Sequence, residues 1–230
     1  MANSSTDIQQ PLTEPAPFVS VVLPVRNEAD FIVENLERLL RQDYPTDRFE
    51  IIVADGLSDD GTQDLVKGVS TEDNRVRLVD NPKRIAPTGM NILIAEAKGE
   101  IIIRLDGHAY VADDFVKQSV LALGQYGDDV WAVGGPIVHV AKTTMGKAVG
   151  LAMSHPLGVG NATHRRHDFE GYGEGTAFPA MYRWAFDKAG MYDESLARNE
   201  TTSCTSASTK PAAGSTSLRK SSTSTLSARN

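Results

Sequence analysis

Residues 18–28 read FVSVVLPVRNE, an apolar and valine-rich run that gives way to polar residues at its end. Branched and aromatic side chains favour strands, so residues 18–25 are predicted to form one. Residues 30–41 then place apolar side chains at intervals of three and four, the spacing of one helical face. A strand followed directly by an amphipathic helix is the first unit of a layered α/β fold.

The strand and helix units recur toward the C-terminus. Apolar strands are predicted at residues 49–54, 75–79 and 100–105, and helices at residues 62–69 and 87–97. Strands that are apolar throughout and separated by helices are typical of a parallel sheet buried on both faces. The sequence therefore predicts an α/β fold of the doubly wound type, with a mainly parallel sheet and helices on both faces.

Beyond residue 105 the pattern is weaker. A helix is predicted at residues 113–126, a strand at residues 131–140 that is interrupted by Gly134-Gly135-Pro136, and a last short helix at residues 183–189. Residues 153–175 are rich in Gly, His and Arg and have little periodicity. Such a composition indicates a functional loop or a lid.

The two ends of the chain differ from its middle. Residues 1–17 are polar and contain several prolines, which predicts a disordered N-terminal arm. From residue 201 onward more than half of the residues are Ser or Thr and none is aromatic, which predicts a disordered tail at residues 201–230. One domain, at residues 18–200, is expected between them.

Composition excludes several classes of function. The formal net charge of −7 leaves no basic footprint for nucleic acid. Cys204 is the only cysteine, so an internal disulfide and a thiolate metal cluster are both excluded. Residues 1–17 lack the pattern of a signal peptide, and no apolar run approaches the roughly 18 residues of a membrane span. A cytoplasmic location is expected.

Polar clusters follow three of the predicted strands. They comprise residues 24–28, which include Pro24, Arg26 and Glu28; residues 55–61, which begin with Asp55; and residues 106–108, Asp106-Gly107-His108. In doubly wound sheets ligands bind beyond the carboxyl ends of the strands. These clusters are therefore the candidates for chemistry.

The order and spacing of these clusters resemble the signature of family 2 glycosyltransferases, which are inverting, nucleotide-sugar-dependent enzymes of the GT-A fold. The matching segments are residues 21–28, residues 54–62, and residues 99–108. Closer similarity is to bacterial enzymes of the succinoglycan and exopolysaccharide type. It rests on residues 81–91, on His108 in place of the usual second aspartate, and on residues 134–136.

The resemblance implies transfer of a hexose from a nucleoside diphosphate sugar, with UDP as the favoured nucleotide, to a polysaccharide or lipid-linked acceptor in exopolysaccharide or cell-envelope biosynthesis. Full-length relatives would associate peripherally with the inner face of the cell membrane. The implied donor-binding residues are Pro24, Arg26, Glu28, Asp55, Arg84 and Asp106. Asp106 and His108 would bind a Mg²⁺ or Mn²⁺ ion that bridges the donor phosphates.

Several of these residues also have a structural reading. Asp106, after an apolar strand, can be a turn residue. The Asp55 carboxylate can accept a hydrogen bond from the imide N–H of uracil, or it can serve as a turn residue before Gly56. Glu28 can contact the nucleotide or favour the N-terminus of the next helix. Asp59 and Asp60 are expected to cap the helix that follows them.

Other polar groups near these clusters remain open. Lys83, Arg84 and Asn91 would bind a phosphate or a sugar hydroxyl, or form a solvated surface. The segment at residues 164–167, His-Arg-Arg-His, is expected to be a flexible surface rather than a metal or phosphate site, and residues 171–175 would line the acceptor side.

An inverting transferase needs a base that accepts the proton of the acceptor hydroxyl. In the family an acidic motif supplies it, and the motif is expected directly after Glu200. Thr201-Thr202-Ser203-Cys204 stands there instead, so no catalytic residue is assigned. Codons for residues 201–213, read one base earlier, can encode an Asp-Asp-Glu-Leu sequence of the missing kind, which predicts a frameshift near codon 200. A genuine Ser/Thr-rich linker is the alternative.

Two other classes of function stay in view. The first is an inactive remnant that binds a nucleotide sugar without the catalytic base. The second is a sugar-phosphate nucleotidyltransferase, which needs a Gly-rich, basic phosphate loop after the first strand. Residues 24–28 lack such a loop, so this class is the less favoured.

Overall fold

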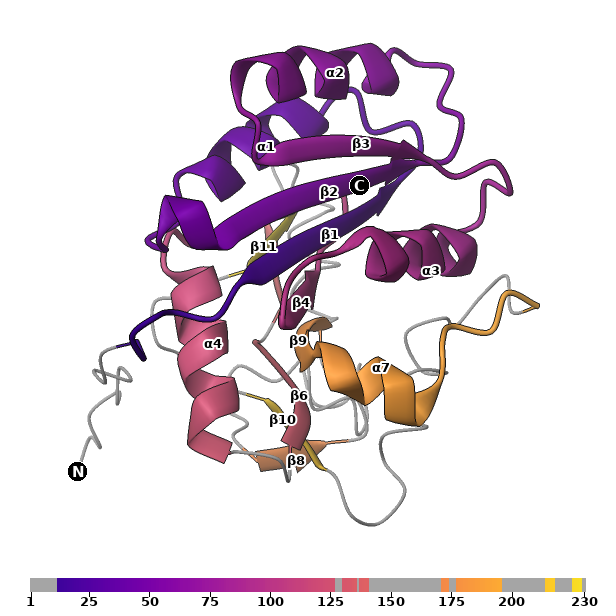
Figure 1. The fold of residues 1–230 in the computed structure, drawn as a ribbon. Helices are drawn as coiled ribbons and strands as arrows, with labels where there is room; N and C mark the ends of the chain where they lie inside the picture. Colours follow the sequence, from indigo (N-terminus) through magenta and orange to yellow (C-terminus); the bar gives the residue numbers. More distant parts are fainter. Residues whose placement is uncertain are drawn as a thin grey trace.

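The computed structural model describes residues 12–126, 130–135, 137–140, 171–173, 177–195, 214–217 and 225–228. Strands and helices alternate through the first half of the chain, as predicted (Figure 1). In chain order they are β1 (Val19–Val25), α1 (Ile32–Leu40), η1 (Thr46–Arg48), β2 (Phe49–Asp55), α2 (Thr62–Glu72), β3 (Val76–Asp80), α3 (Ala86–Glu96), β4 (Ile101–Arg104), β5 (Ala109–Tyr110) and α4 (Phe115–Tyr126). The second half adds β6 (Val130–Gly135), β7 (Ile137–Val140), β8 (Gly171–Gly173), β9 (Ala177–Tyr182), α7 (Arg183–Ala189), β10 (Gly214–Ser217) and β11 (Thr225–Ala228).

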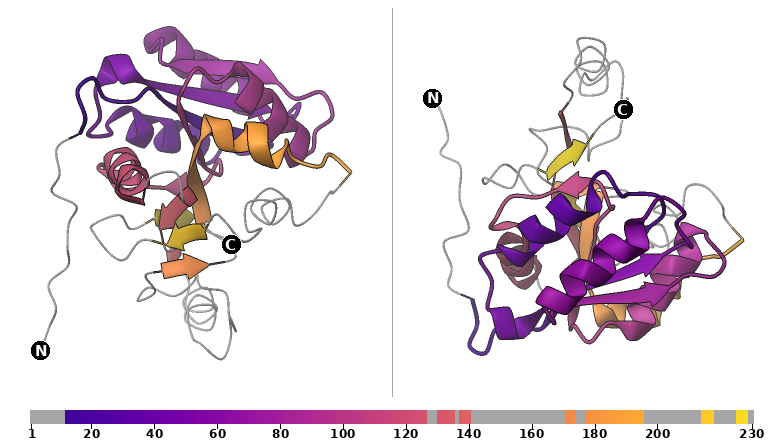
Figure 2. Two further views of the ribbon diagram at one scale, coloured as in Figure 1. Left: turned by 60° about the horizontal axis from the view of Figure 1, so that its bottom comes forward. Right: turned by 90° about the horizontal axis from the view of Figure 1, so that it is seen from above.

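The main sheet has eight strands in the order β3-β2-β1-β4-β9-β6-β10-β8. The strands β3, β2, β1 and β4 run parallel to one another, whereas β9 is antiparallel to both β4 and β6. Figure 2 shows β8 and β10 at the end of the sheet far from β3. The predicted α/β fold with a mainly parallel sheet is confirmed. A second sheet of three strands has the order β5-β11-β7.

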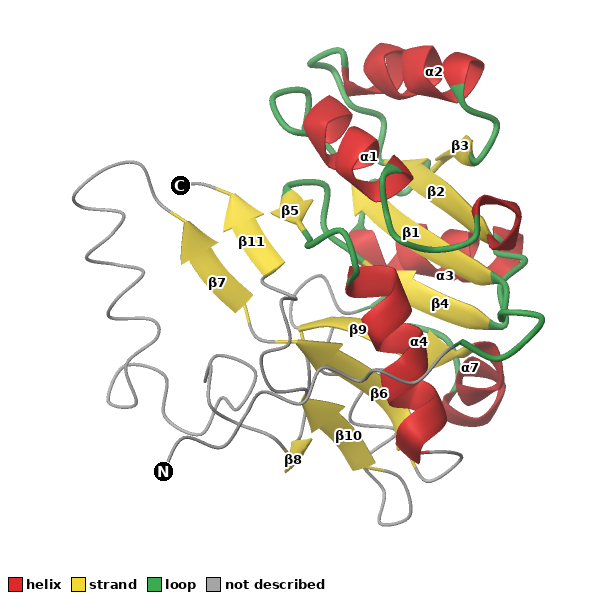
Figure 3. Cartoon of the chain, turned by 90° about the vertical axis from the view of Figure 1, so that its left-hand side faces the viewer, coloured by secondary structure: helices red, strands yellow, loops and turns green. Residues whose placement is uncertain are grey.

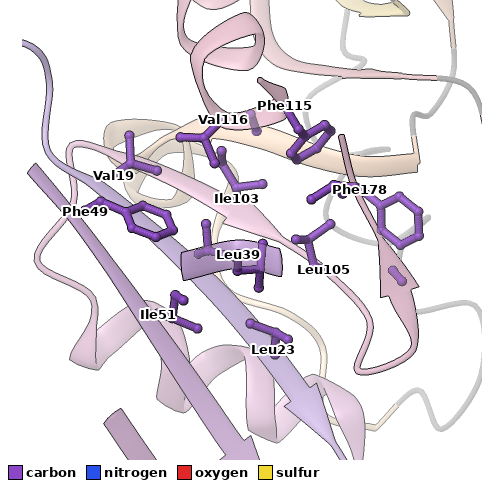
Figure 4. Packing of buried hydrophobic residues seen from close by; sticks show 14 of the residues in the cluster. Val19, Leu23, Leu39, Phe49, Ile51, Ile103, Leu105, Phe115, Val116 and Phe178 are labelled. Carbon is purple, nitrogen blue, oxygen red and sulfur yellow. The ribbon is translucent and has the colours of Figure 1, made fainter. Parts of the chain in front are cut away.

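Successive residues of β1 contribute to two hydrophobic clusters on opposite faces of the sheet. Val21 and Leu23 pack with the apolar faces of α1 and α4, whereas Val22 packs with α3 and α7. Figure 4 shows Leu23 together with other residues of the first cluster. Figure 3 shows α1 and α4 in front of the strands and α3 behind them. Because both faces are covered, every residue of β1 except Pro24 is buried, which explains the uninterrupted apolar run in the sequence.

Residues 131–140 form two strands rather than one. β6 belongs to the main sheet and ends at Gly135, whereas β7 belongs to the small sheet and begins at Ile137. The predicted interruption at residues 134–136 coincides with this boundary. The strand β9 was not predicted. Its apolar run is short and follows a stretch with little periodicity, so pattern alone did not separate it from the loop.

The C-terminal tail differs from expectation at two places. β10 and β11 are strands of four residues each within residues 201–230, for which no ordered structure is predicted. Pairing along a neighbouring strand uses backbone hydrogen bonds, and these require no apolar side chain. The rest of the tail, like residues 1–11, lies outside the described residues.

Among the helices that the structure describes, none has both the length and the apolar character needed to traverse a lipid bilayer.

Candidate functional site

The three polar clusters all follow parallel strands of the main sheet. In the strand register Val25 of β1 lies beside Asp55 of β2, and Asp55 lies beside Asp80 of β3. On the other side of β1, Val22 pairs with Arg104, the last residue of β4. The loops after β1, β2 and β4 therefore leave the sheet at the same end, as predicted.

Backbone donors of the loop after β1 hydrogen-bond to side chains of the loop after β2 and of Thr62, the first residue of α2. The amide of Asn27 donates to Ser58 Oγ at 2.9 Å, the amide of Glu28 to Thr62 Oγ1 at 2.9 Å, and the amide of Ala29 to an Asp60 carboxylate oxygen at 3.0 Å. We call this set of three bonds the loop clamp. It makes the two loops one unit, so any ligand that contacts one of them is fixed relative to the other.

Asp59 does not cap α2, contrary to the prediction. Its carboxylate accepts from Asn27 Nδ2 at 2.9 Å, and its amide donates to Asn27 Oδ1 at 3.1 Å. The N-cap residue of α2 is Gly61, whose φ of 95° favours glycine, and it makes no capping hydrogen bond from a side chain. Asp60 does accept from the amide of Thr62, at 3.0 Å, in the first turn. The prediction failed for Asp59 because its partner lies on another loop.

Asp55 is fully buried at the end of β2. Its carboxylate accepts hydrogen bonds from Ser58 Oγ at 2.5 Å, from the Ser58 amide at 2.9 Å and from Gln63 Nε2 at 3.0 Å. A carboxylate offers about four acceptor positions, so the chain's own groups engage most of them. The turn contacts expected of Asp55 are present, and its role toward a nucleobase remains a prediction.

The loop after β4 carries Asp106 and His108. Arg104 donates to the Asp106 carboxylate at 2.8 Å, and 35% of the Asp106 side chain is exposed. Behind the loop, Asn35 of α1 donates from Nδ2 to the carbonyl oxygens of Asp106 and Gly107, at 3.1 and 2.9 Å. Asn35 was not predicted to be a site residue. The available signal was an amide between Ile32 and Leu36 on the apolar face of the predicted helix.

Glu28 and His108 are direct partners. The Glu28 carboxylate lies 2.9 Å from His108 Nδ1, with 16% of the Glu28 side chain and 38% of the His108 side chain exposed. The hydrogen bond to Glu28 raises the pKa of His108 above its usual value; burial of the ring opposes the rise, and the charges of Glu28 and Asp106 add to it. A Cβ atom at Gly107 would lie 2.8 Å from Glu28 Cγ. Glu28 therefore packs directly over the loop.

Pro24, Arg26 and Arg84 lie around the same edge of the sheet. Pro24 is half-buried, and Arg26 and Arg84 are exposed. Pro24 packs close to α3, since a Cβ at Gly89 would lie 3.4 Å from Pro24 Cβ. Arg84 adopts a left-handed φ of 60°. Exposed guanidinium groups at this edge suit an anionic ligand, and their contacts to one remain a prediction.

Lys83 and Asn91 contact the segment that follows α7. Lys83 Nζ lies 2.6 Å from the Glu194 carboxylate, and Asn91 Nδ2 donates to Glu194 at 3.0 Å and to the Tyr192 carbonyl at 3.0 Å. The hydrogen bonds from Lys83 and Asn91 hold the pKa of Glu194 below its usual range. Lys83 and Asn91 were predicted either to contact a ligand or to form a solvated surface, and neither prediction included these contacts with the segment after α7.

The side chains of Asp106 and His108 can coordinate a divalent cation only if a bound ligand or water supplies the remaining coordinating atoms. Asp106 supplies carboxylate oxygen and His108 imidazole nitrogen, which suit Mn²⁺ well and Mg²⁺ less well. In the described part of the chain, no group of three or more His, Cys, Asp or Glu residues is arranged to hold a metal ion. Phosphate oxygens and water would have to complete the coordination, as is common for Mg²⁺ sites.

Several predicted features lie outside the described residues. They are most of residues 153–175, including the His-Arg-Arg-His segment and Glu174, and residues 196–213, which hold the expected position of the acidic motif. Of the first stretch the structure describes residues 171–173 as β8.

The chain has relatives among known proteins. The family described as Glycosyl transferase family 2 matches residues 20–188. The chain is 35% identical over 187 residues to the succinoglycan biosynthesis protein ExoA of Rhizobium meliloti (strain 1021), covering 78% of this chain and 54% of that protein. The chain spans about half the length of the curated relatives it matches.

Two solved structures show the same fold at low sequence identity. Staphylococcus aureus TarS 1-349 in complex with UDP-GlcNAc has a TM-score of 0.71 and 17% identity, covering 93% of this chain and 59% of that one. The mannosyltransferase PcManGT from Pyrobaculum calidifontis, in complex with GDP-Man and Mn²⁺, has a TM-score of 0.65 and 21% identity, covering 95% and 60%. These likenesses establish the GT-A fold.

Proposed function

The chain belongs to glycosyltransferase family 2, and from this we propose that it binds a nucleoside diphosphate sugar at the carboxyl ends of β1, β2 and β4. The proposed reaction is inverting transfer of a hexose to a polysaccharide or lipid-linked acceptor. The observation that carries the proposal is the 2.9 Å contact between Glu28 and His108, because it joins the loop after β4 to the clamped loops after β1 and β2. A single site at one edge of the sheet results.

We propose UDP as the nucleotide. Asp55 is fully buried here and would accept the imide N–H of uracil once the loop after β2 moves away from its carboxylate. Pro24 and Arg26, at the end of β1, would lie against the nucleotide. TarS, which shares the fold, forms a complex with UDP-GlcNAc, and this supports the choice. Arg84 would meet the phosphates, since a guanidinium matches phosphate oxygens in a bidentate way.

Asp106 and His108 would hold the divalent cation, Mn²⁺ or Mg²⁺. When bound there, the ion supplies Lewis-acid stabilisation of the leaving diphosphate. The chain's own groups orient the site: Arg104 holds the Asp106 carboxylate, and Asn35 holds the loop backbone. PcManGT, with the same fold, binds Mn²⁺ together with GDP-Man, which supports a metal of this kind.

Binding of a donor without transfer is the second candidate. The observation in its favour is Thr201-Thr202 at the expected place of the acidic motif, because a neutral hydroxyl cannot accept a proton near pH 7 as a carboxylate does. We propose that the acceptor is reached by peripheral association with the inner face of the cell membrane.

Titration calorimetry with UDP in the presence of Mn²⁺ and of a chelator tests donor binding. We expect tight binding only with Mn²⁺, and loss of most of that dependence in Asp106→Ala. Asp43→Ala is the matched control, since Asp43 pairs with Lys117 on the surface. Equal UDP affinity with and without Mn²⁺ would refute the metal assignment.

A turnover assay with a panel of UDP-sugars separates the two candidates. The chain is compared with a version read in the alternative frame from codon 200, in which the proposed acidic motif can be encoded. We expect transfer by the restored version and a rate about 10²- to 10⁴-fold lower without the base. Comparable turnover by the two would show that the base lies elsewhere.

A further inference from the structure

His108 has two ring nitrogens that face different partners. Nδ1 lies 2.9 Å from the Glu28 carboxylate. Nε2, on the far side of the ring, is the nitrogen left for a cation, and the ring is 38% exposed. Which nitrogen carries the proton in a neutral imidazole is set by the hydrogen bond that the other makes. A carboxylate at Nδ1 therefore selects the tautomer with an unprotonated Nε2.

The Glu28 carboxylate is held against His108 by its own surroundings. Its aliphatic part covers Gly107, where a side chain would collide with Glu28 Cγ at 2.8 Å and with Val25 Cγ1 at 2.9 Å. Its amide is fixed by Thr62 in the loop clamp. Phe31 meets the His108 ring edge-on, with the ring centroids 6.4 Å apart. The pair is thus enclosed on several sides by packed groups.

A direct contact between Glu28 and the donor is the less favourable reading on two grounds. The carboxylate is only 16% exposed and is engaged by His108. A carboxylate close to a diphosphate would also add repulsion between like charges. Glu28 serves the site better behind His108 than in front of the phosphates.

We infer that Glu28 is a positioning residue, which fixes His108 with its proton on Nδ1 and presents Nε2 to the divalent cation that accompanies the donor. The inference rests on the proposed function for the identity of the cation, but the state of the ring does not require any ligand. Carboxylates behind metal-binding histidines set the tautomer and ring orientation in the same way, and their loss typically lowers metal affinity 10- to 100-fold.

Two variants separate the hydrogen-bond acceptor of the Glu28 side chain from its negative charge. Glu28→Leu keeps apolar bulk over Gly107 and removes the acceptor. Glu28→Gln keeps an amide oxygen that can accept from Nδ1–H and removes the charge. Since Asn35 anchors the loop backbone independently, the loop should stay in place in both. Thermal unfolding of each variant checks that the fold is intact.

The first readout is the pair of imidazole ¹⁵N chemical shifts of His108, at a pH where the ring is neutral and without ligand. His108→Ala assigns the signals among the 5 histidines. We expect a protonated Nδ1 in the parent chain and in Glu28→Gln, and a shift toward the Nε2–H form in Glu28→Leu. The same tautomer in the parent and in Glu28→Leu would overturn the inference, even if UDP and Mn²⁺ bind normally.

The second readout is Mn²⁺ affinity in the presence of UDP, measured by electron paramagnetic resonance. Glu28→Leu should weaken it by about 10- to 100-fold, and Glu28→Gln by less. In a His108→Ala background Glu28→Leu should have no further effect; an equal loss there would overturn the inference. If the parent chain bound no Mn²⁺ with UDP, the proposed function would fail, and the tautomer measurement would still decide the role of Glu28.

Discussion

Asn35 of α1 hydrogen-bonds through Nδ2 to the carbonyl oxygen of Gly107, at 2.9 Å and across 72 positions of sequence. The same amide group reaches the Asp106 carbonyl at 3.1 Å. Asn35 is fully buried, so no water replaces these bonds at low cost. Helix α1 therefore holds the backbone of the proposed metal-binding loop in place.

Replacement of Asn35 is expected to weaken both the fold and the site. Asn35→Ala removes the Asn35 donor from the buried Gly107 carbonyl, which costs about 1 to 3 kcal/mol of unfolding free energy, whereas the Asp106 carbonyl still accepts from the Ala109 amide at 3.0 Å. Asn35→Asp should cost more, because a carboxylate would face two carbonyl oxygens. Urea unfolding gives the order of stability. An Asn35→Asp variant as stable as the parent would contradict the assigned orientation of the amide.

Gly107→Ala should disturb the loop directly. Its Cβ would lie 2.8 Å from Glu28 Cγ and 2.9 Å from Val25 Cγ1, and overpacking of this kind costs about 1 to 3 kcal/mol. Gly68→Ala is the matched control, since a Cβ at Gly68 within α2 meets nothing within 4 Å. We expect Gly68→Ala to stabilise the chain by about 0.5 to 1 kcal/mol. Thermal unfolding of both variants provides the comparison, and equal behaviour would show that the loop yields freely.

Asp55→Asn tests recognition of the base. The amide presents one donor and one acceptor where the carboxylate presents two acceptors, so we expect UDP binding to weaken by about 1 to 3 kcal/mol. Ser58→Ala serves as a control, because it removes the hydroxyl that donates to Asp55 and leaves the carboxylate. Calorimetry with UDP and ADP separates the roles: a loss confined to UDP supports base recognition, whereas unchanged UDP affinity would leave Asp55 as a turn residue.

Ionisation of the buried Tyr44 side chain is expected to lower the stability of the fold at alkaline pH. Its hydroxyl donates to the Pro17 carbonyl at 2.6 Å, and burial, with the charge of Glu100, raises the pKa of Tyr44 to about 12 from 10. A raised pKa means that the folded chain holds the proton more tightly than the unfolded chain. The stabilisation is therefore complete below pH 10 and is lost as the pH rises toward 12, by at most roughly 2 to 3 kcal/mol.

The Tyr44→Phe variant isolates this contribution. A phenylalanine side chain cannot ionise, so the unfolding free energy of the variant should fall less steeply between pH 10 and 12 than that of the parent. Chemical unfolding at several pH values in this window measures the difference. Parallel pH profiles of the two proteins would assign the alkaline loss to other groups.

The parallel half of the fold was predictable because β1, β2 and β4 are buried on both faces. The apolar run of β1 and the spaced apolar residues of α1 record that burial in the local sequence. β9 was not predictable in the same way, because its antiparallel place between β4 and β6 depends on partners far away in the chain. Local patterns report which face is buried and do not report which strand lies beside it.

The placement of the candidate residues at one end of the sheet was predictable, and their contacts less so. Asp55 ends β2, Asp106 and His108 follow β4, and the carboxyl ends of parallel strands lie at the same end of the sheet, so their proximity followed from topology. The pairing of Glu28 with His108 joins residues 80 positions apart and depends on the turn each loop makes after its strand. No spacing in the sequence encodes that geometry.

The loop clamp has donors and acceptors of different kinds. Its donors are the backbone amides of Asn27, Glu28 and Ala29, which nearly every amino acid supplies, whereas its acceptors are the side chains of Ser58, Asp60 and Thr62. The donor positions therefore tolerate more amino-acid substitutions than the acceptor positions, although both take part in the same three bonds. In a saturation library selected for folded protein, Ala29 would accept every residue but proline for its part in the clamp, while Asp60 and Thr62 would retain only oxygen-bearing side chains of similar reach.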